Sequence, residues 1–337
     1  MTMVYKVLII MSMDSEVIFR QIPHGKRKWG NCEFYINEDI KNPDFVFVFD
    51  ELVKEITLTT NRNNTCLVTG EPPSVRMYSK VFTKQFGWLL SCQKNIYTRK
   101  NGIKSQPLLP WLAGIKQIGK NIGKYKSNEM LNYDFFSSQN KIETNRLNRI
   151  VVITSNKRIS KGHCQRLDFI HELERLFPGK IDKFGNGFAS VEDKYDVYKK
   201  YKYVLVIENC EYPSYWTEKL SDAFLANCYP LYIGDPEILN YFPHNSLTRL
   251  NINDVKESAD IINKILNNDF YTKYFDELLK GKDLILNEYN LFNRIRYFVN
   301  SHIDTSESSF EITLRPNQTD MFYILLKLFF NIFHFEI

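Results

Sequence analysis

The sequence predicts an α/β protein of two domains, in which the C-terminal domain has a parallel β-sheet with helices on both faces. The first observation is size, because 337 residues with 44% hydrophobic content suffice for two separate cores. The second is an alternation in the second half of the chain. Short β-branched runs follow segments of helical period there, which is typical of a parallel sheet.

The first half contains five strand-like apolar runs separated by polar, irregular spacers. These runs are 4–10, 32–36, 44–49, 65–69 and 86–91. Residues 106–115 include two prolines, a tryptophan and a glycine, which indicates a structured loop. The apolar pattern weakens over 116–149, so we predict one domain over 1–130 and a second over 148–300.

The second half alternates more regularly between the two periods. Strands are predicted at 150–154, 181–184, 203–207 and 229–233, and helices at 163–177, 192–201 and 216–227. Open parallel sheets bind ligands at the carboxyl ends of their strands. Functional groups are therefore expected directly after these four strands.

Several protein classes are excluded by composition. No internal run reaches the roughly 20 apolar residues of a membrane-spanning helix, and residues 1–13 resemble a strand more than a signal peptide. The six cysteines are widely spaced and form no C-x-x-C, which favours reduced thiols over disulfides or zinc. These features predict a cytoplasmic protein.

Residues 72–128 contain eleven basic residues and no Asp or Glu. A long stretch of one charge attracts anions, whether phosphate, acidic glycan, nucleic acid or anionic membrane. The alternative is a solvated lysine-rich loop.

Residues 201–236 hold the densest group of polar side chains. Glu208 and Asn209 follow an apolar strand, and Thr217 is a favourable N-cap for the next helix. Glu218 suits the helix dipole, but Lys219 in the first turn opposes it. A bound diphosphate would explain that lysine, although a solvated surface lysine is the alternative.

A second group follows the strand at 150–154. Arg166 lies near a helix start, where its guanidinium could bind phosphate oxygens in a fork. His163 is interpreted as a capping or packing residue. In the first domain, Glu71 follows a strand and precedes two prolines, and it is either a surface residue or a functional carboxylate.

Two absences restrict the chemistry. The chain has no Asp-x-Asp, the usual carboxylate clamp for a metal, and neither of the glycine-rich phosphate motifs. Phosphate charge would then be neutralised by lysine, arginine and helix termini.

The segment 201–236 resembles the signature of the α-1,3/4-fucosyltransferases, glycosyltransferase family 10. That signature has E-N, a six-residue step to Tyr, then x-T-E-K, a helix and P-x-Y-x-G-x-P. The matching residues are Glu208, Asn209, Tyr215, Thr217, Glu218, Lys219, Pro230, Tyr232, Gly234 and Pro236. Arg166 resembles the family's phosphate-binding arginine, and Thr69-Gly70-Glu71 is similar to its first-domain T-G-E.

The resemblance implies two Rossmann-like domains facing across a cleft, the GT-B arrangement. It implies inverting transfer of L-fucose from GDP-fucose to a glycan, with an α-1,3 type linkage, no cofactor and no essential metal. Glu71 would be the catalytic base. Donor binding would fall to Arg166, Asn209, Tyr215, Glu218 and Lys219. Acceptors would be lipopolysaccharide, lipid-linked or protein glycans, and no nucleic-acid partner is expected.

Two other functions remain open at this point. The same fold could use a different nucleotide-sugar donor, or the chain could be a non-catalytic protein that binds anions or glycans. The simultaneous presence of Glu71, Arg166, Glu218 and Lys219 favours an enzyme.

The C-terminal region 305–337 is predicted to be a polar linker, 305–317, followed by an amphipathic tail. On a helix, Asp320, Tyr323, Lys327, Asn331 and His334 form one polar stripe. Such a helix either packs in the core or lies in a membrane interface. The preceding polar segment and the family resemblance favour peripheral contact with the inner face of a membrane, helped by the basic stretch.

Overall fold

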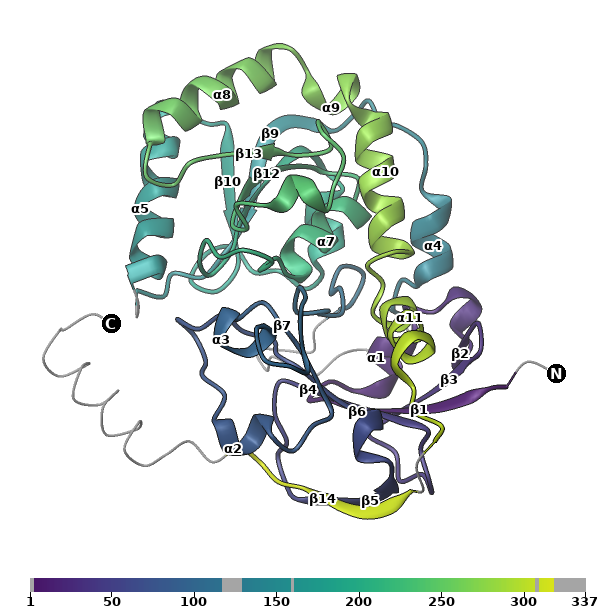
Figure 1. The fold of residues 1–337 in the computed structure, drawn as a ribbon. Helices are drawn as coiled ribbons and strands as arrows, with labels where there is room; N and C mark the ends of the chain where they lie inside the picture. The colour runs from purple at the N-terminus through teal and green to yellow at the C-terminus, as the bar shows by residue number, and fades with distance from the viewer. Residues whose placement is uncertain (1–2, 117–128, 159–160, 307–308, 318–337) are drawn as a thin grey trace, which may run out of the picture. The chain divides into compact units, whose positions relative to one another are not determined.

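The computed structural model describes residues 3–116, 129–158, 161–306 and 309–317 (Figure 1). Internal contacts divide the chain into two compact units. Unit 1 comprises Met1–Ser12, Asn31–Ser105 and Phe298–Ile337, and unit 2 comprises Met13–Gly30 and Gln106–Tyr297. The sequence analysis divided the chain at contiguous boundaries instead. The units are discontinuous because Met13–Gly30 packs with unit 2, whereas residues 298–306 and 309–317 pack with unit 1.

Unit 1 is built on a parallel sheet in the order β3-β1-β4-β6-β7-β8. Its five predicted strands are confirmed as β1 (Tyr5–Ile10), β3 (Cys32–Ile36), β4 (Phe45–Phe49), β6 (Thr65–Val68) and β7 (Trp88–Ser91). Pairing is parallel from β3 through β8 (Gly102–Lys104). The sequence analysis missed β8 and β2 (Lys28–Trp29), since two or three residues are too few to show a period.

Both faces of this sheet are covered. Side chains alternate along β4, so Phe45 and Phe47 form ring contacts with Phe298 at the end of helix α11 (Leu291–His302). Val48 belongs instead to a cluster on the other face. That cluster includes residues of the short helices α2 (Lys80–Thr83) and α3 (Lys94–Tyr97), namely Phe82 and Ile96.

The predicted linker 305–317 is wrong over part of its length. Residues Phe310–Leu314 form strand β14, which pairs antiparallel with β5 (Ile56–Thr60). Leu314 is buried in the core of unit 1. The alternating apolar residues Phe310, Ile312 and Leu314 therefore favour a strand here, although the flanking residues are polar. Residues 318–337, the predicted amphipathic tail, lie outside the described residues.

Unit 2 contains a five-stranded parallel sheet in the order β10-β9-β11-β12-β13. The four predicted strands are confirmed as β9 (Leu147–Ile153), β10 (Ile181–Phe184), β11 (Tyr201–Ile207) and β12 (Tyr229–Ile233); β13 (Thr248–Arg249) is short. The predicted helices are confirmed as α5 (Lys161–Leu176), α6 (Lys194–Tyr198) and α7 (Glu218–Leu225).

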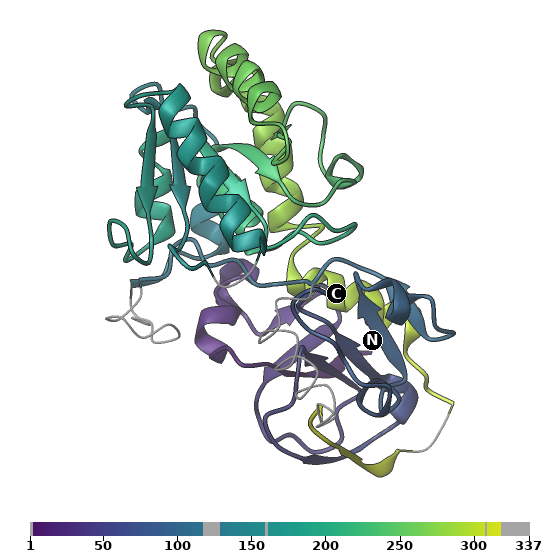
Figure 2. The same ribbon diagram turned by 90° about the vertical axis from the view of Figure 1, so that its left-hand side faces the viewer.

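The strand order places these helices on both faces of the sheet. The chain moves from β9 to β10 in one direction and then returns past β9 to β11 and β12, so right-handed crossovers put α5 opposite α6 and α7. Figure 2 looks onto α5, and Figure 1 shows α8 (Val255–Asn267) near α5 and α10 (Phe275–Leu286) beside α7.

The remaining helices are short or lie toward the edges of unit 2. They are α1 (Ser15–Phe19), α4 (Tyr133–Ser138) and α9 (Phe270–Lys273), with 3-10 turns at Pro23–Gly25 and Ile238–Asn240. Within the described ranges, no helix combines the length and apolarity needed to cross a bilayer.

Candidate functional site

A pocket of about 260 Å³ lies in unit 2 at the carboxyl ends of β9 and β11. This is the edge at which parallel sheets bind ligands. Its polar lining comes from the segments after both strands and from the starts of α5, α6 and α7. These residues are Thr154, Ser155, Lys157, His163, Arg166, Lys194, Asn209, Glu218 and Lys219.

Arg166 is buried in the wall of this pocket. The residue is 8% exposed, and no ion pair is recorded for it in the described part of the chain. Its Nε is buried without a hydrogen-bond partner, and burial lowers the pKa of the guanidinium. A buried cation without a carboxylate is costly, so an anionic ligand would complete this site.

Lys219 also lines the pocket but is held by protein groups. Its Nζ lies 3.1 Å from Glu208 Oε2 and 3.0 Å from Thr217 Oγ1. The Glu208 side chain is fully buried, whereas that of Lys219 is 27% exposed. Glu208 and Thr217 therefore hold the ammonium at the pocket lining, and its third N–H is available for a ligand.

Glu208 fixes the start of α7 as well. Its Oε1 accepts hydrogen bonds from the backbone N–H of Thr217 at 2.8 Å and from the Thr217 hydroxyl at 3.1 Å. Thr217 caps α7 as predicted, because its Oγ1 accepts from the Lys219 N–H. One carboxylate thus positions both the helix N-terminus and its first-turn lysine.

Gly234 lies where a side chain would clash with Glu208 and Tyr232. A Cβ at this position would lie 2.6 Å from Glu208 Cγ and 2.3 Å from Tyr232 Oη. Tyr232 is buried, and its hydroxyl accepts a hydrogen bond from the Asp235 N–H at 2.9 Å. The segment 230–236 therefore supports Glu208 through close packing.

Lys194 is a pocket residue that the sequence analysis missed. Its Nζ lies 2.7 Å from Asp222 Oδ2 and 3.8 Å from Glu218 Oε1. The fully buried Asp222 also accepts the backbone N–H groups of Leu112 and Ala113, each at 2.7 Å. Lys194 lies in the first turn of α6, so the dipole argument that selected Lys219 would have found it.

The carboxylates of Asp222 and Asp193 hold the predicted loop 106–115 through its backbone. Asp193, the N-cap of α6, accepts the Gly114 N–H at 2.8 Å. Gly114 has a positive φ of 81°, and a Cβ there would lie 2.6 Å from Leu131 Cβ. Buried carboxylates on α6 and α7 thus fix this loop, which the structure assigns to unit 2.

The charges in the pocket shift one another's protonation. Burial alone would raise the pKa of Glu218, but the ammonium groups of Lys219 and Lys194 hold it below its usual value. Burial opposes the charged form of Lys219, yet Glu208 and Glu218 raise its pKa. Burial, followed by repulsion from Arg166 and Lys157, lowers the pKa of His163. The pocket therefore presents carboxylates, fixed cations and a neutral imidazole near neutral pH.

Four of the five predicted donor-binding residues line this one pocket: Arg166, Asn209, Glu218 and Lys219. Tyr215 does not line it. Tyr215 is buried, and its hydroxyl accepts from Asn209 Nδ2 at 3.5 Å. Tyr215 therefore contacts the pocket through Asn209.

Glu71 lies in unit 1, directly after β6, in a turn fixed by Asp50. The Gly70 N–H donates to Asp50 Oδ1 at 3.1 Å and to the Tyr78 hydroxyl oxygen at 3.2 Å. Tyr78 and Arg76 both donate to the Asp50 carboxylate. Burial and the Asp50 charge raise the pKa of Tyr78, so the phenol stays protonated and keeps this turn rigid.

The opposite side of the turn is held through its backbone. Gln93, which is buried, donates from Nε2 to the carbonyl oxygens of Glu71 at 2.9 Å and Arg76 at 2.8 Å. The sequence analysis selected Glu71 but missed Asp50, Tyr78 and Gln93, because their contacts span 8 to 28 residues. In the parts of the chain that are described, no three His, Cys, Asp or Glu residues converge as metal ligands.

Known proteins resemble this chain in sequence and in fold. The model of glycosyltransferase family 10 (fucosyltransferase), C-terminal part, matches residues 144–278. A candidate fucosyltransferase of Acanthamoeba polyphaga mimivirus is 37% identical over 93 residues, 28% of this chain and 14% of that protein. Alpha-(1,3)-fucosyltransferase B of Drosophila melanogaster is 27% identical over 150 residues, 39% of this chain and 33% of that protein.

This chain thus aligns with well under half of the length of either relative. The solved structures extend further in fold. The crystal structure of an alpha1,3-fucosyltransferase has a TM-score of 0.53 at 15% identity and covers 90% of this chain and 91% of that chain. Its form with GDP-fucose has a TM-score of 0.51 over the same shares.

The predicted α/β fold class, two Rossmann-like domains of GT-B type, is confirmed by these matches and by the two parallel sheets. The family match covers β9 through α9 and the first residues of α10, and it includes the pocket and every element of the 201–236 signature. Residues 144–278 of this chain are thus similar to the C-terminal part of glycosyltransferase family 10, the fucosyltransferase family.

Proposed function

We propose that this protein transfers L-fucose from GDP-fucose to a hydroxyl of a glycan acceptor, with inversion, an α-1,3 type linkage and no essential metal. The observation that carries the proposal is Arg166, a buried guanidinium that pairs with no carboxylate of the described residues and lines the same pocket as Lys219. A diphosphate is the anion that this family context favours, and the GDP-fucose complex of a similar fold supports the donor.

In the proposed reaction, an acceptor oxygen attacks the anomeric carbon of fucose while the bond from that carbon to the β-phosphate oxygen breaks. Glu71 accepts the proton from the acceptor hydroxyl as the general base. The leaving GDP gains negative charge as the bond breaks. Arg166 and Lys219 stabilise that charge, and because both are held before the reaction, little reorganisation is needed.

The remaining lining groups would orient the donor. The amide of Asn209 and the carboxylate of Glu218 are suited to hydroxyls of ribose or fucose. Tyr215 would act behind Asn209 by holding its amide. Lys194 offsets part of the negative charge of Glu218 and Asp222, which helps to keep the phosphate position positive.

Calorimetry with GDP and with UDP tests the donor assignment on the full chain. We expect GDP to bind at least tenfold more tightly than UDP, and Arg166→Ala to weaken GDP binding by about tenfold to a hundredfold, the value of a charge-assisted contact. Arg175→Ala is the matched control, because Arg175 lies on the same helix and pairs with Glu172 at 3.0 Å. Tighter binding of UDP than of GDP would show that the donor is a different nucleotide sugar. Binding of GDP without any transfer across an acceptor array would establish a non-catalytic protein.

We also propose peripheral contact with an anionic membrane on the cytoplasmic side, through the C-terminal tail. The support is the polar stripe of residues 320–334 in the sequence together with the basic stretch 72–128. This would place the enzyme beside glycans carried on lipid.

A further inference from the structure

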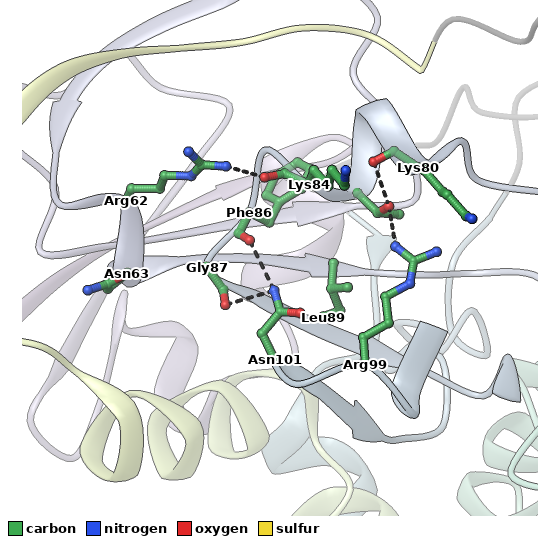
Figure 3. A pocket seen from close by; sticks show the side chains of 10 residues that line it. Arg62, Asn63, Lys80, Lys84, Phe86, Gly87, Leu89, Arg99 and Asn101 are labelled. Carbon is green, nitrogen blue, oxygen red and sulfur yellow. Dashed lines mark hydrogen bonds between the residues drawn. The ribbon is translucent and has the colours of Figure 1, made fainter. Parts of the chain in front are cut away.

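A second pocket, of about 470 Å³, lies wholly in unit 1, and every charged residue in its lining is basic (Figure 3). Its volume is within the range of small-molecule sites, roughly 300–1,000 Å³. The lining residues are Arg62, Asn63, Lys80, Thr83, Lys84, Phe86, Gly87, Leu89, Arg99 and Asn101. Three of the four cations belong to the acid-free stretch 72–128, and Arg62 comes from outside it.

This pocket is separate from the site proposed above. Asn63 precedes β6, Gly87 precedes β7 and Asn101 precedes β8, so the pocket lies at the amino ends of these parallel strands. Glu71 follows β6 and therefore lies at the opposite edge of the same sheet. Four residues of β6 separate the two edges by about 13 Å, at about 3.3 Å per residue.

Both arginines are held in place by neutral groups. Arg99 Nη1 donates to Oγ1 of the buried Thr83 at 2.5 Å, and its Nε donates to the Asn95 carbonyl oxygen at 3.1 Å. Arg62 Nη2 donates to the Lys84 carbonyl oxygen. Figure 3 shows the two guanidinium groups reaching α2 from different elements. Each keeps further N–H groups that could reach a ligand.

Carboxylates of the described residues do not pair with these four cations. Within the described ranges, no ion pair is recorded for Arg62, Lys80, Lys84 or Arg99. One carboxylate reaches the lining, because Asp304 accepts from Asn63 Nδ2 at 2.9 Å, and Asp304 is also bound by Ser306. Four like charges around one hollow repel one another and create a strong local field for anions.

We propose that this pocket binds a ligand with two phosphate groups, as a diphosphate or a bisphosphate. One phosphate carries about −1.5 to −2 charges near pH 7, so two balance the four cations. The fixed guanidinium forks suit phosphate oxygens, and the two lysines act as mobile point charges. The ligand is either a free small molecule or the headgroup of a lipid, since both present the same chemistry.

Calorimetric titration of pyrophosphate into the full chain tests this site. We expect Lys80→Gln/Lys84→Gln to weaken one pyrophosphate-binding event by about tenfold. No hydrogen bond is recorded for either ammonium within the described residues, so folding should be unaffected. The control is Lys41→Gln/Lys54→Gln, which removes the same charge from exposed positions of unit 1. Arg166→Ala should leave this event intact, which separates it from binding in unit 2.

Sedimentation with vesicles distinguishes the two sources. A headgroup ligand predicts binding to vesicles that contain an inositol bisphosphate lipid, weaker binding to phosphatidylserine vesicles of equal charge, and loss in Lys80→Gln/Lys84→Gln. A free ligand predicts the pyrophosphate effect alone. If the lysine pair and its control behave alike in both assays, the pocket is not a phosphate site.

Discussion

Glu208 Oε2 lies 3.1 Å from Lys219 Nζ, and the same carboxylate accepts the N–H of Thr217 at 2.8 Å. A buried acid thus connects the end of β11 to the first turn of α7. Its consequence is that Lys219 has two roles, because it neutralises Glu208 and also faces the pocket. Substitutions can separate these roles.

Lys219→Ala should lower both stability and GDP affinity. It leaves the buried Glu208 carboxylate without its cation, which costs about 1–3 kcal/mol of unfolding free energy at this partly exposed pair. The double variant Lys219→Ala/Glu208→Gln should regain most of that stability, because a glutamine oxygen still accepts from Thr217, but it should not regain GDP affinity. Urea unfolding and calorimetry measure the two quantities. Recovery of both would show that Lys219 is only structural.

Glu71→Gln should reduce transfer by about a hundredfold to ten-thousandfold, the usual value of a general base. GDP affinity should stay within a few-fold, because Glu71 and the donor pocket belong to different units. Single-turnover transfer with saturating donor measures the chemical step. Glutamine keeps the shape of the side chain, so a variant that retains more than a tenth of the wild-type rate would exclude Glu71 as the base.

Lys282 should make the unfolding free energy of the protein increase as the pH is raised above about 7. It is 1% exposed, and its Nζ donates to the Gln139 carbonyl oxygen at 2.5 Å and to Asn227 Oδ1 at 3.1 Å. Burial, with repulsion from Arg146, lowers its pKa to about 7. In the unfolded chain the pKa is about 10.4.

The sign of this dependence follows from proton binding. Between about pH 7 and 10.4 the unfolded state binds more protons at this lysine, so the unfolding free energy rises with pH. Below about pH 7 both states are protonated and the contribution is constant. From pH 7 to about 9.5 the rise from this group should reach about 3 kcal/mol.

Urea unfolding of Lys282→Met should lack this rise. Lys280→Met, a neighbour on α10 whose side chain is 65% exposed, is the control and should keep the wild-type pH profile. Parallel profiles for wild type and Lys282→Met would show that Lys282 does not titrate in this range.

Transfer should persist in excess EDTA. The expectation rests on Arg166 and Lys219 supplying the positive charge that a metal would otherwise bring to the diphosphate, and on the absence of Asp-x-Asp from the sequence. Initial rates with and without chelator, followed by addition of Mn²⁺ or Mg²⁺, measure the effect. Loss of activity that either metal restores would contradict a metal-independent reaction.

Deletion of residues 318–337 should release the protein from anionic vesicles. On a helix, the sequence of this segment has one narrow polar stripe and a mostly apolar remainder. Unfolding free energy and activity on a soluble acceptor should stay unchanged, because the proposal assigns the tail to the membrane and not to the core. Aggregation or unfolding of the shortened protein would instead place the tail in the core.

Local signals accounted for most of unit 2. A β-branched run predicted β9, apolar runs predicted β11 and β12, and the Thr217 cap predicted the start of α7. These features depend on neighbours within one strand or one helical turn, so the sequence alone determines them. The signature around Glu208 and Lys219 could be recognised from the sequence for the same reason, because its residues are close together in the chain.

The tertiary structure decided which distant groups meet. Asp222 joins Lys194 to the backbone of residue 112, and β14 pairs with β5 across some 250 residues. Arg62 joins a basic stretch that begins ten residues later in the chain, and a single pocket gathers their charges. Such contacts depend on strand order and on how helices cover a sheet. The spacing of residues along the chain carries no record of either, and only the packed core of each unit fixes them.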